Sequence, residues 1–334
     1  MSIFDKIGQY SARGMLRMHT PGHKGKLDAR DLTEIEEVFP LDAIEIAEAE
    51  AARVYGAAHM RFLVGGSSAG VKAAVMSAPG DILAENISHQ SVAEGAELAG
   101  KKLYMLERGS ENGLYVPPSA DEVIEAAERC GAGTVLLTSP DYYGRTVNES
   151  VFTAVKRAGY TLIVDGAHGA HFAFSPLFPA PPCAYADMCN MSAHKTLGAY
   201  TQSALLAVNE LSFVQKTDKA LKLIGTTSPS YILLAGLESA IAAARKASDR
   251  YAELYEAVKG LKKKYVFACN DDFSRLVLDC APYGRTGAAV YRALLEKGVA
   301  AEKYDLRYVV FIVTHYDTPD DIERLSEKLG EVLR

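Results

Sequence analysis

Residues 161–171 have the sequence TLIVDGAHGAH, and residues 190–206 have the sequence NMSAHKTLGAYTQSALL. Each stretch begins with a short, mostly apolar run, which is typical of a strand buried on both faces of a sheet. The first run leads into Asp165, and the second leads into His194 and Lys195. In open α/β sheets, ligands bind in the crevice beyond the carboxyl ends of the strands. The two stretches therefore predict a parallel sheet with an acid and a lysine in its ligand crevice.

Similar short, β-rich runs recur on both sides of these stretches. The predicted strands are Arg61–Gly65, Asp81–Glu85, Lys102–Leu106, Thr134–Ser139, Thr161–Asp165, Ala186–Met191 and Ala204–Val208. Helical or glycine-bearing segments such as Ser119–Cys130 and Glu149–Ala158 separate most of them. Strands that alternate with helices indicate a mostly parallel sheet with helices on both faces. We therefore expect an α/β fold built on a mostly parallel seven-stranded sheet.

The two ends of the chain have different patterns. Residues 1–60 are mostly polar and predict an irregular segment with a helix around Leu41–Tyr55. After residue 209, the sequence first predicts one long helix over Tyr231–Lys263 with at most one break. A strand at Arg275–Asp279, a helix at Thr286–Lys297 and a strand at Tyr308–Thr314 follow. The last predicted element is a helix with Thr318 as its N-cap. We therefore divide the chain into an N-terminal arm and helix (1–55), a large domain (56–245) and a small C-terminal α+β domain (246–334).

Composition excludes several classes of protein. The chain has 334 residues, a net charge of −6, 49% hydrophobic residues and 23% charged residues, which are globular values. It lacks the excess of Lys and Arg that binds a nucleic-acid backbone, and no apolar run approaches the ~20 residues that span a bilayer. Its five cysteines have no Cys-x-x-Cys spacing. We expect a cytoplasmic protein with no nucleic-acid or membrane partner.

Two further segments follow predicted strands. Residues 64–76, VGGSSAGVKAAVM, place a Gly-Gly turn before a helix that begins near Ser67. The N–H groups and dipole of a helix N-terminus can bind an anion, although an ordinary strand-to-helix turn has the same pattern. Residues 85–92, ENISHQSV, place His89 between a strand and a helix, where it either caps the helix or stacks on a ring.

The acid and the lysine each have an alternative interpretation. Asp165 at a buried strand end is costly unless it pairs with another group. His168 and His171 suggest zinc, but no third ligand is evident. Lys195 is either a solvated loop residue or a buried lysine that forms a Schiff base. Pyridoxal phosphate (PLP) needs an anion site, an acid for its pyridine nitrogen and a lysine for its imine, so the combined pattern predicts PLP and no metal.

These segments resemble the fold-type-I PLP enzymes, and more closely the bacterial ornithine/lysine/arginine decarboxylase family. The matching motifs are HTPGHKG (19–25), GGSSAG (65–70), SHQSV (88–92), TSPDYYGRTVN (138–148), VDGAHGAH (164–171), SAHKTLGAYTQ (192–202) and TTSPSYILLAGLE (226–238). They occur in the family's order over roughly residues 15–330. The resemblance implies the PLP-dependent transferase fold in a short form that lacks the family's usual further C-terminal domain. It departs from the family at Gly166, where members usually have Glu, and at residues 65–68, where they usually have Asn-Gly-Thr-Ser.

The resemblance also implies roles for individual residues. Lys195 would form the internal aldimine, Asp165 would pair with the pyridine nitrogen, and His89 and Ala167 would pack against the two faces of the ring. The implied cofactor-binding set is completed by Ser67, Ser68, Ala69, His168, Ser192, His194, Thr227 and Ser228. Of these, Thr227 and Ser228 would reach the cofactor of a partner subunit, because family members are homodimers with the active site at the interface.

The function that the resemblance implies is decarboxylation of a basic amino acid (arginine, lysine or ornithine) in polyamine biosynthesis. Lys195, Asp165 and His89 would be the catalytic residues, with Lys195 or His89 returning a proton to Cα. Two alternatives remain. A transaminase or lyase would use Arg275 or Arg307 to hold the substrate carboxylate, although a surface position is the favoured interpretation of both. A non-catalytic PLP-binding paralogue is the other.

Overall fold

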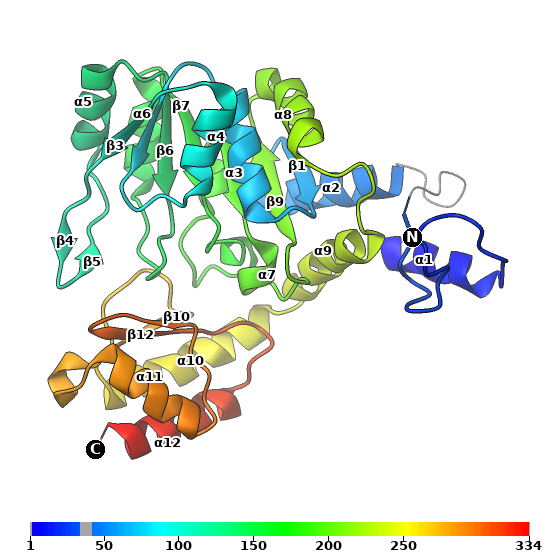
Figure 1. Cartoon of the computed structure of the whole chain (residues 1–334). Helices are drawn as coiled ribbons and strands as arrows, with labels where there is room; N and C mark the ends of the chain where they lie inside the picture. The colour runs from blue at the N-terminus through cyan, green and yellow to red at the C-terminus, as the bar shows by residue number, and fades with distance from the viewer. Residues whose placement is uncertain (1, 34–41, 334) are drawn as a thin grey trace.

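The computed structural model describes residues 2–33 and 42–333. Its centre is a seven-stranded sheet with the strand order β1-β9-β8-β7-β6-β2-β3 (Figure 1). The strands are β1 (His59–Leu63), β2 (Ile82–Glu85), β3 (Leu103–Leu106), β6 (Thr134–Thr138), β7 (Thr161–Asp165), β8 (Met188–Met191) and β9 (Ala204–Val208). Only β9 runs antiparallel to its neighbours. The prediction of a mostly parallel seven-stranded sheet is confirmed.

Helices cover both faces of this sheet, as the alternation of its side chains requires. Leu136 and Ile163 pack with α3, α4 and α8, whereas Val135 and Leu162 pack with the helices of the opposite face. The helices of the first face are α3 (Gly66–Ser77), α4 (Ser91–Ala99) and α8 (Leu211–Ile224). Those of the second are α2 (Asp42–Tyr55), α5 (Ala120–Cys130), α6 (Glu149–Arg157) and α9 (Tyr231–Ala244). The strands are therefore buried on both sides, which explains why they are continuously apolar.

The C-terminal part of the chain forms a second, three-stranded sheet with the order β10-β12-β11. Its elements are α10 (Ser248–Lys264), β10 (Arg275–Asp279), α11 (Gly287–Glu296), β11 (Lys303–Tyr304), β12 (Tyr308–Ile312) and α12 (Pro319–Val332). Thr318 caps α12 through a reciprocal pair of hydrogen bonds with Asp321, as the sequence predicts. The long helix expected over residues 231–263 has one break, since α9 ends at Ala244 and α10 begins at Ser248.

Several elements were not predicted, and they include the following three. The first is α1 (Ile3–Ala12), whose buried Ile3, Ile7 and Tyr10 lie on one helical face, so the expectation of an irregular N-terminus is wrong there. The second is α8, in a segment for which no element was assigned. The third is a hairpin of β4 (Ser110–Glu111) and β5 (Leu114–Tyr115), which turns at Asn112-Gly113 with positive φ at both residues. An Asn-Gly pair is a strong signal for such a turn.

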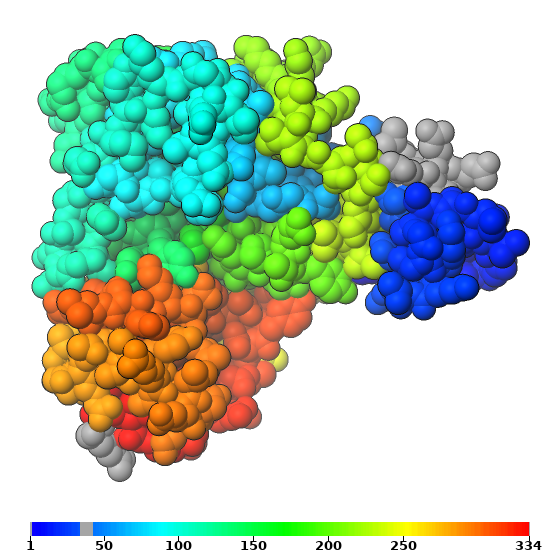
Figure 2. Space-filling model, in the orientation of Figure 1, coloured from blue at the N-terminus to red at the C-terminus, as the bar shows by residue number. Residues whose placement is uncertain are grey.

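The overall shape is a two-part body with a projecting N-terminal arm. The C-terminal sheet and the helices that pack on it lie below the seven-stranded sheet. The N-terminal helix α1 and the loop that follows it project to one side (Figures 1 and 2). The division into residues 1–55, 56–245 and 246–334 stays a prediction. Within residues 2–33 and 42–333, no helix has the length and apolar character needed to cross a membrane.

Candidate active site

A cavity of about 760 Å³ lies between the seven-stranded sheet and the C-terminal sheet. One wall consists of residues that follow strands of the large sheet, and the other consists of the β4–β5 hairpin and residues 303–308. The lining includes the side chains of Ser67, His89, Asn112, Thr138, Asp141, Tyr142, Tyr143, Asp165, Ala167, His168, Lys195, Lys303, Asp305, Arg307 and Tyr308. Its size and position are those of a site for a small organic ligand.

Lys195 lies in this cavity on the short helix α7 (Ala193–Thr196), directly after β8. Its Nζ atom is 3.3 Å from Nε2 of His168. Burial lowers the pKa of Lys195, and the positive charge of Arg275 lowers it further, while Asp165 and Glu302 act in the opposite direction. Lys195 is half-buried and its pKa is lowered, which favours a lysine that can form a Schiff base over a fully solvated loop lysine.

Asp165 ends β7 in the same cavity and is buried. Its Oδ1 atom accepts hydrogen bonds from Nδ2 of Asn190 at 3.3 Å and from the backbone N–H of Ala167 at 3.2 Å. Burial raises the pKa of Asp165, and these hydrogen bonds with the charges of Lys195 and His89 only partly oppose it. A buried carboxylate with raised pKa is stabilised by a cationic or N–H-bearing ligand, which a protonated pyridine ring would supply.

The arginine expected at the surface of the C-terminal sheet is instead buried. Arg275 is 1% exposed at the start of β10, so the surface interpretation is wrong for this residue. Its Nη2 atom is 3.2 Å from Nδ1 of His168, while its Nε and Nη1 atoms have no partner among the described residues. Gly144, with φ of +82°, packs so closely that a Cβ there would lie 2.8 Å from Cβ of Arg275. This close approach of the loop after β6 fixes the guanidinium beside the cavity.

Arg307 has a different environment. It lines the cavity, but both arms of its guanidinium bind Asp279, with Nε 2.9 Å from Oδ1 and Nη2 2.7 Å from Oδ2. The hydrogen bonds to Arg307 lower the pKa of Asp279. A guanidinium already held by two bonds to one carboxylate is a poorer candidate for a substrate carboxylate than Arg275.

The start of α3 is the candidate site for an anion. Ser67 and Ser68 occupy the first turn of this helix and are half-buried, and no side chain of the described residues caps the turn at Gly65. The backbone N–H of Gly66 donates to the carbonyl of Gln202 across 2.8 Å, which places α3 beside the segment that carries Lys195. The uncapped N–H groups and the dipole of α3 favour a phosphate.

Two buried hydroxyl groups near Lys195 support the same interpretation. The Oγ atoms of Ser192 and Ser203 are buried and have no hydrogen-bond partner among the described residues. A buried hydroxyl without a partner costs free energy, and a bound anion removes that cost by accepting its hydrogen bond. The residues present therefore fit PLP, with Lys195 for the imine, Asp165 for the ring nitrogen, and α3 for the phosphate.

The structure brings six of the expected cofactor-binding residues to the cavity and leaves six outside its lining. The first group is Ser67, His89, Asp165, Ala167, His168 and Lys195. The second group is Ser68, Ala69, Ser192, His194, Thr227 and Ser228. His89 accepts hydrogen bonds from Ser91 at its Nδ1 atom, so it caps α4 and lines the cavity at the same time. Contact of either group with the cofactor stays a prediction.

The two histidines that suggested zinc have separate partners. His168 lies between Lys195 and Arg275. The Nε2 atom of His171 is instead 3.1 Å from Oγ of Ser274 and 3.2 Å from Oδ2 of Asp272. No group of three or more His, Cys, Asp or Glu side chains that could hold a metal ion occurs within residues 2–33 and 42–333.

Apart from Arg307, sequence reasoning did not assign the far wall of the cavity. Tyr142 and Tyr143 donate to Glu302 at 2.6 Å and to Asp305 at 2.5 Å, which joins the loop after β6 to the C-terminal sheet. Nζ of Lys303 lies 4.2 Å from the centre of the Tyr142 ring. The motif TSPDYYG pointed to the two tyrosines, but residues 302–305 carry no motif and are far away in the sequence.

A buried ionic cluster lies behind this wall. Nη1 of Arg108 is 3.4 Å from Oε1 of Glu85, and neither side chain is exposed. Burial raises the pKa of Glu85 to about 7, and burial also raises the pKa of Asp141. Asp141 lines the cavity, and its buried Oδ2 atom has no hydrogen-bond partner among the described residues. Burial therefore favours the neutral forms of both carboxyl groups, and a cationic group placed beside them would favour the charged forms.

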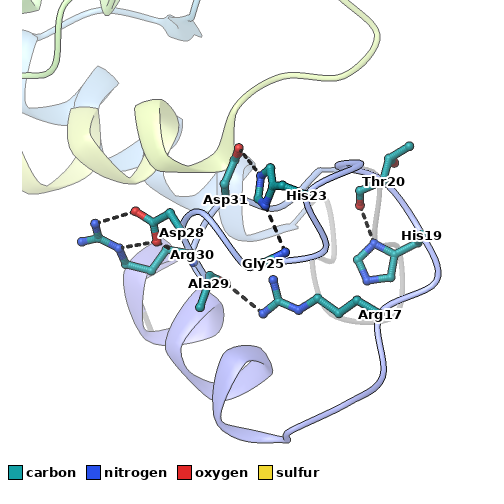
Figure 3. Close-up of polar contacts among 9 residues, drawn as sticks. All are labelled: Arg17, His19, Thr20, His23, Gly25, Asp28, Ala29, Arg30 and Asp31. Atoms are coloured by element: carbon teal, nitrogen blue, oxygen red, sulfur yellow. Dashed lines mark hydrogen bonds and ion pairs between the residues drawn. The ribbon is translucent and has the colours of Figure 1, made fainter.

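The motif HTPGHKG lies on the projecting arm (Figure 1), and none of its residues lines the cavity. Figure 3 shows polar contacts within this arm. His23 accepts from the backbone N–H of Gly25 at Nδ1, and its Nε2 atom is 3.1 Å from Asp31. The Nζ atom of Lys24 donates to the carbonyl of His19 across 2.7 Å. The motif therefore builds a compact loop held by its own polar contacts.

Comparison with known proteins agrees with this geometry. The sequence model of the family "Orn/Lys/Arg decarboxylase, major domain" matches residues 27–265, which is most of the chain. The chain belongs to the Orn/Lys/Arg decarboxylase family. Enzymes of this family are PLP-dependent, so the membership and the fit of the cavity residues indicate the same cofactor.

Two curated relatives and one solved structure illustrate the membership. An arginine decarboxylase of Bacillus subtilis (strain 168) is 27% identical over 99% of this chain and 76% of its own length. YaaO of the same organism is 28% identical over 79% of this chain. Lysine decarboxylase A from Pseudomonas aeruginosa has a TM-score of 0.82 at 20% identity over 98% of this chain. The chain spans 61% of the length of YaaO and 59% of that lysine decarboxylase.

Proposed function

We propose that this protein is a PLP-dependent decarboxylase of a basic amino acid: arginine, lysine or ornithine. The observation that carries the proposal is the placement of Lys195 and Asp165 in one cavity, with the pKa of the lysine lowered by burial and the pKa of the acid raised by burial. Family membership supports the reaction class. We also infer that the protein acts in the cytoplasm in polyamine formation; its five free cysteines are usual for a reducing compartment.

The chain's own residues have separate tasks in this reaction. Bound PLP supplies an electron sink for the electron pair that remains when the carboxylate leaves as CO₂. Lys195 would hold the cofactor through its Nζ atom, and Asp165 would hold a proton at the ring nitrogen. The N-terminus of α3 with Ser67 would bind the phosphate.

A proton must return to Cα after CO₂ has left. Lys195 and His89 both line the cavity and can carry a proton. The Nζ atom of Lys195 is 3.3 Å from Nε2 of His168, which orients the amine within the cavity. We therefore assign the protonation to Lys195 first, with His89 as a stacking group.

Asp141 supports a basic substrate. Its carboxylate is buried at the cavity wall, Oδ1 accepts the backbone N–H groups of Tyr143 and Arg145 at 2.9 and 3.0 Å, and Oδ2 has no hydrogen-bond partner among the described residues. An ammonium or guanidinium group would supply the missing donor. Of the other acids that could bind a basic side chain, Glu34, Glu36 and Glu37 lie outside the described residues.

A homodimer with the active site at the interface is the assembly that we propose. Thr227 and Ser228 are exposed on the loop between α8 and α9, outside the cavity of their own chain. Thr33 of the arm donates to the carbonyl of Pro229 in this loop, so the arm and the loop form one surface. The arm exposes four large apolar side chains, namely Met15 (54%), Leu16 (87%), Met18 (78%) and Leu27 (86%). Exposed apolar groups that lie close together favour burial by another chain.

A second candidate function follows from Arg275. Its Nε and Nη1 atoms are buried without a partner, which favours a ligand carboxylate beside Lys195. In transamination on this scaffold, the substrate keeps its carboxylate, and the enzyme binds it. Accumulation of pyridoxamine phosphate after mixing with an amino acid, without CO₂, would establish that reaction.

The test of the proposed function combines spectroscopy with CO₂ measurement. Purified wild type should show a visible absorption band with PLP, and Lys195→Ala should lose that band. Arginine, lysine or ornithine should perturb the band and release CO₂. If wild type binds PLP but releases no CO₂ from any basic amino acid, the decarboxylase proposal is wrong. If no band forms, the cofactor assignment is wrong as well.

A further inference from the structure

Three basic side chains lie in a row at the cavity. Nζ of Lys195 is 3.3 Å from Nε2 of His168, and Nδ1 of the same imidazole is 3.2 Å from Nη2 of Arg275. The three come from α7, the turn after β7 and the start of β10. His168 is 8% exposed and Arg275 is 1% exposed, so the contact between these two side chains is shielded from bulk water. Nδ1 of His168 therefore depends on Arg275 for its hydrogen bond.

Arg275 decides which nitrogen of His168 carries the proton. A guanidinium has N–H donors and no acceptor, and it stays protonated in proteins. The contact with Nδ1 is therefore a hydrogen bond only if Nδ1 has a free lone pair. A neutral imidazole has one N–H group, so its proton is then on Nε2. His168 is in this neutral form because burial, followed by the charges of Arg275 and Lys195, lowers its pKa.

The protonated nitrogen of His168 faces the amine of Lys195. An ammonium group has three donors and no acceptor, so a charged Lys195 would place N–H against N–H. An uncharged amine has a lone pair and can accept the hydrogen bond from Nε2. Without Arg275, the imidazole could carry its proton on Nδ1 and accept a hydrogen bond from an ammonium. The arginine thus removes the tautomer that would stabilise the charged lysine.

Other charges around the row act in both directions. Asp165 and Glu302 favour the charged form of Lys195, while Arg275 also opposes that form through its own charge. Lys303 and His171 act on His168 and favour its neutral form. A test must therefore separate the effect of Arg275 through His168 from its direct charge effect on Lys195.

Arg275 itself is held firmly in place. Its carbonyl accepts from Nδ2 of Asn270 across 2.7 Å, and its guanidinium carbon lies 6.0 Å from the centre of the Tyr142 ring. Gly144 packs against Cβ and Cγ of Arg275, which restricts the base of this side chain. From this position, Nη2 of the guanidinium lies 3.2 Å from Nδ1 of His168.

We propose that Arg275 is a positioning residue. It fixes the tautomer of His168, and His168 in turn keeps the amine of Lys195 uncharged, the form that can react with a carbonyl group. This deepens the proposed function, because it concerns the same lysine, but its test does not require turnover. The quantity to measure is the pH at which half of Lys195 is reactive in the cofactor-free protein.

The experiment is reductive methylation of the cofactor-free protein over a range of pH, with peptide mass spectrometry of each lysine. Exposed Lys263 is the internal reference. In wild type, Lys195 should reach half-reactivity at lower pH than Lys263. In Arg275→Met, this midpoint should rise by about one pH unit. His168→Leu, which removes the imidazole but keeps the site apolar, should show a similar rise.

The double variant decides between the two effects of Arg275. If Arg275 acts through His168, then Arg275→Met adds no further rise in the His168→Leu background. A further rise of similar size there would show a direct charge effect and overturn the proposal. An unchanged midpoint in folded Arg275→Met would also overturn it. If Arg275→Met does not fold, His168→Leu alone is decisive: an unchanged midpoint overturns the proposal, and a rise supports it.

A failure of this proposal differs from a failure of the proposed function. The visible band with PLP in wild type reports whether Lys195 is the cofactor lysine. A normal band together with unchanged midpoints would leave the cofactor assignment intact and remove the role of Arg275. Absence of the band together with shifted midpoints would leave the hydrogen-bond row intact and remove the cofactor assignment.

Discussion

Asn190 donates a hydrogen bond from Nδ2 to Oδ1 of Asp165 across 3.3 Å, and both residues are buried. The amide comes from β8 and the carboxylate from the end of the neighbouring strand β7. Gly70 of α3 packs on this pair so closely that a Cβ there would lie 2.3 Å from Oδ1 of Asn190. The cofactor acid, its amide partner and the anion-binding helix are therefore fixed relative to one another.

Replacement of the acid tests this arrangement. In Asp165→Asn, the protein should fold and keep its phosphate site, because an amide has almost the same shape as a carboxylate. CO₂ release should fall on the order of 10²–10³-fold, since the charge that stabilises a protonated ring nitrogen is lost. Initial rates with saturating PLP measure the effect. Asp121→Asn on exposed α5 is the matched control, and an equal loss of rate in both variants would contradict the role of Asp165.

The buried carboxyl of Glu85 predicts a pH dependence of stability. Burial raises its pKa from 4.5 to about 7, despite Arg108 at 3.4 Å. The native state therefore binds more protons than the unfolded state, so this stabilising contribution is fully present below the unfolded pKa and is lost as pH rises through about 7.

Glu85→Gln removes this titration. Relative to the variant, wild type should lose about 3 kcal/mol of unfolding free energy between about pH 4 and pH 8, measured by urea denaturation at several pH values. Glu128→Gln, at an exposed position on α5, is the control and should follow wild type. Parallel curves for wild type and Glu85→Gln would show that Glu85 does not titrate in this range.

Asp141→Asn tests recognition of a basic side chain. The variant keeps an acceptor for the backbone N–H groups of Tyr143 and Arg145 but loses the negative charge at the cavity wall. The KM for the best basic amino acid should rise about 10- to 100-fold, as expected for loss of a hydrogen bond between charged groups. The visible spectrum with PLP should stay unchanged. A change in the spectrum without a change in KM would assign Asp141 to the cofactor instead.

The exposed apolar side chains of the arm predict an assembly surface. Leu16→Asp and Met18→Asp should each shift the protein toward smaller species in sedimentation-equilibrium experiments, because a carboxylate is costly in an apolar interface. Leu295→Asp places the same charge at an exposed position of α11 and should leave the mass unchanged. A monomeric wild type, or equal masses for all variants, would remove the arm from the interface.

The central sheet and half of the expected cofactor residues could be predicted from the sequence because the signals are local. The strands are continuous apolar runs, and Lys195 and Asp165 follow directly after two of them. α1 was missed because its polar residues outnumber the three buried ones, which gain their stability only from packing against α9. The burial of Arg275 could not be predicted, since it depends on Gly144, a residue in another part of the chain.

The walls of the cavity come from different regions of the gene. One wall, with Lys195 and Asp165, belongs to the large sheet, and the other, with Asn112, Asp305 and Tyr308, comes from a hairpin and the C-terminal sheet. Mutations in the second wall can therefore alter which amino acid is accepted while the cofactor chemistry stays intact. Such a division lets an ancestral catalyst diversify by drift or recombination in its C-terminal coding region, and it tells an engineer where to randomise for new specificity.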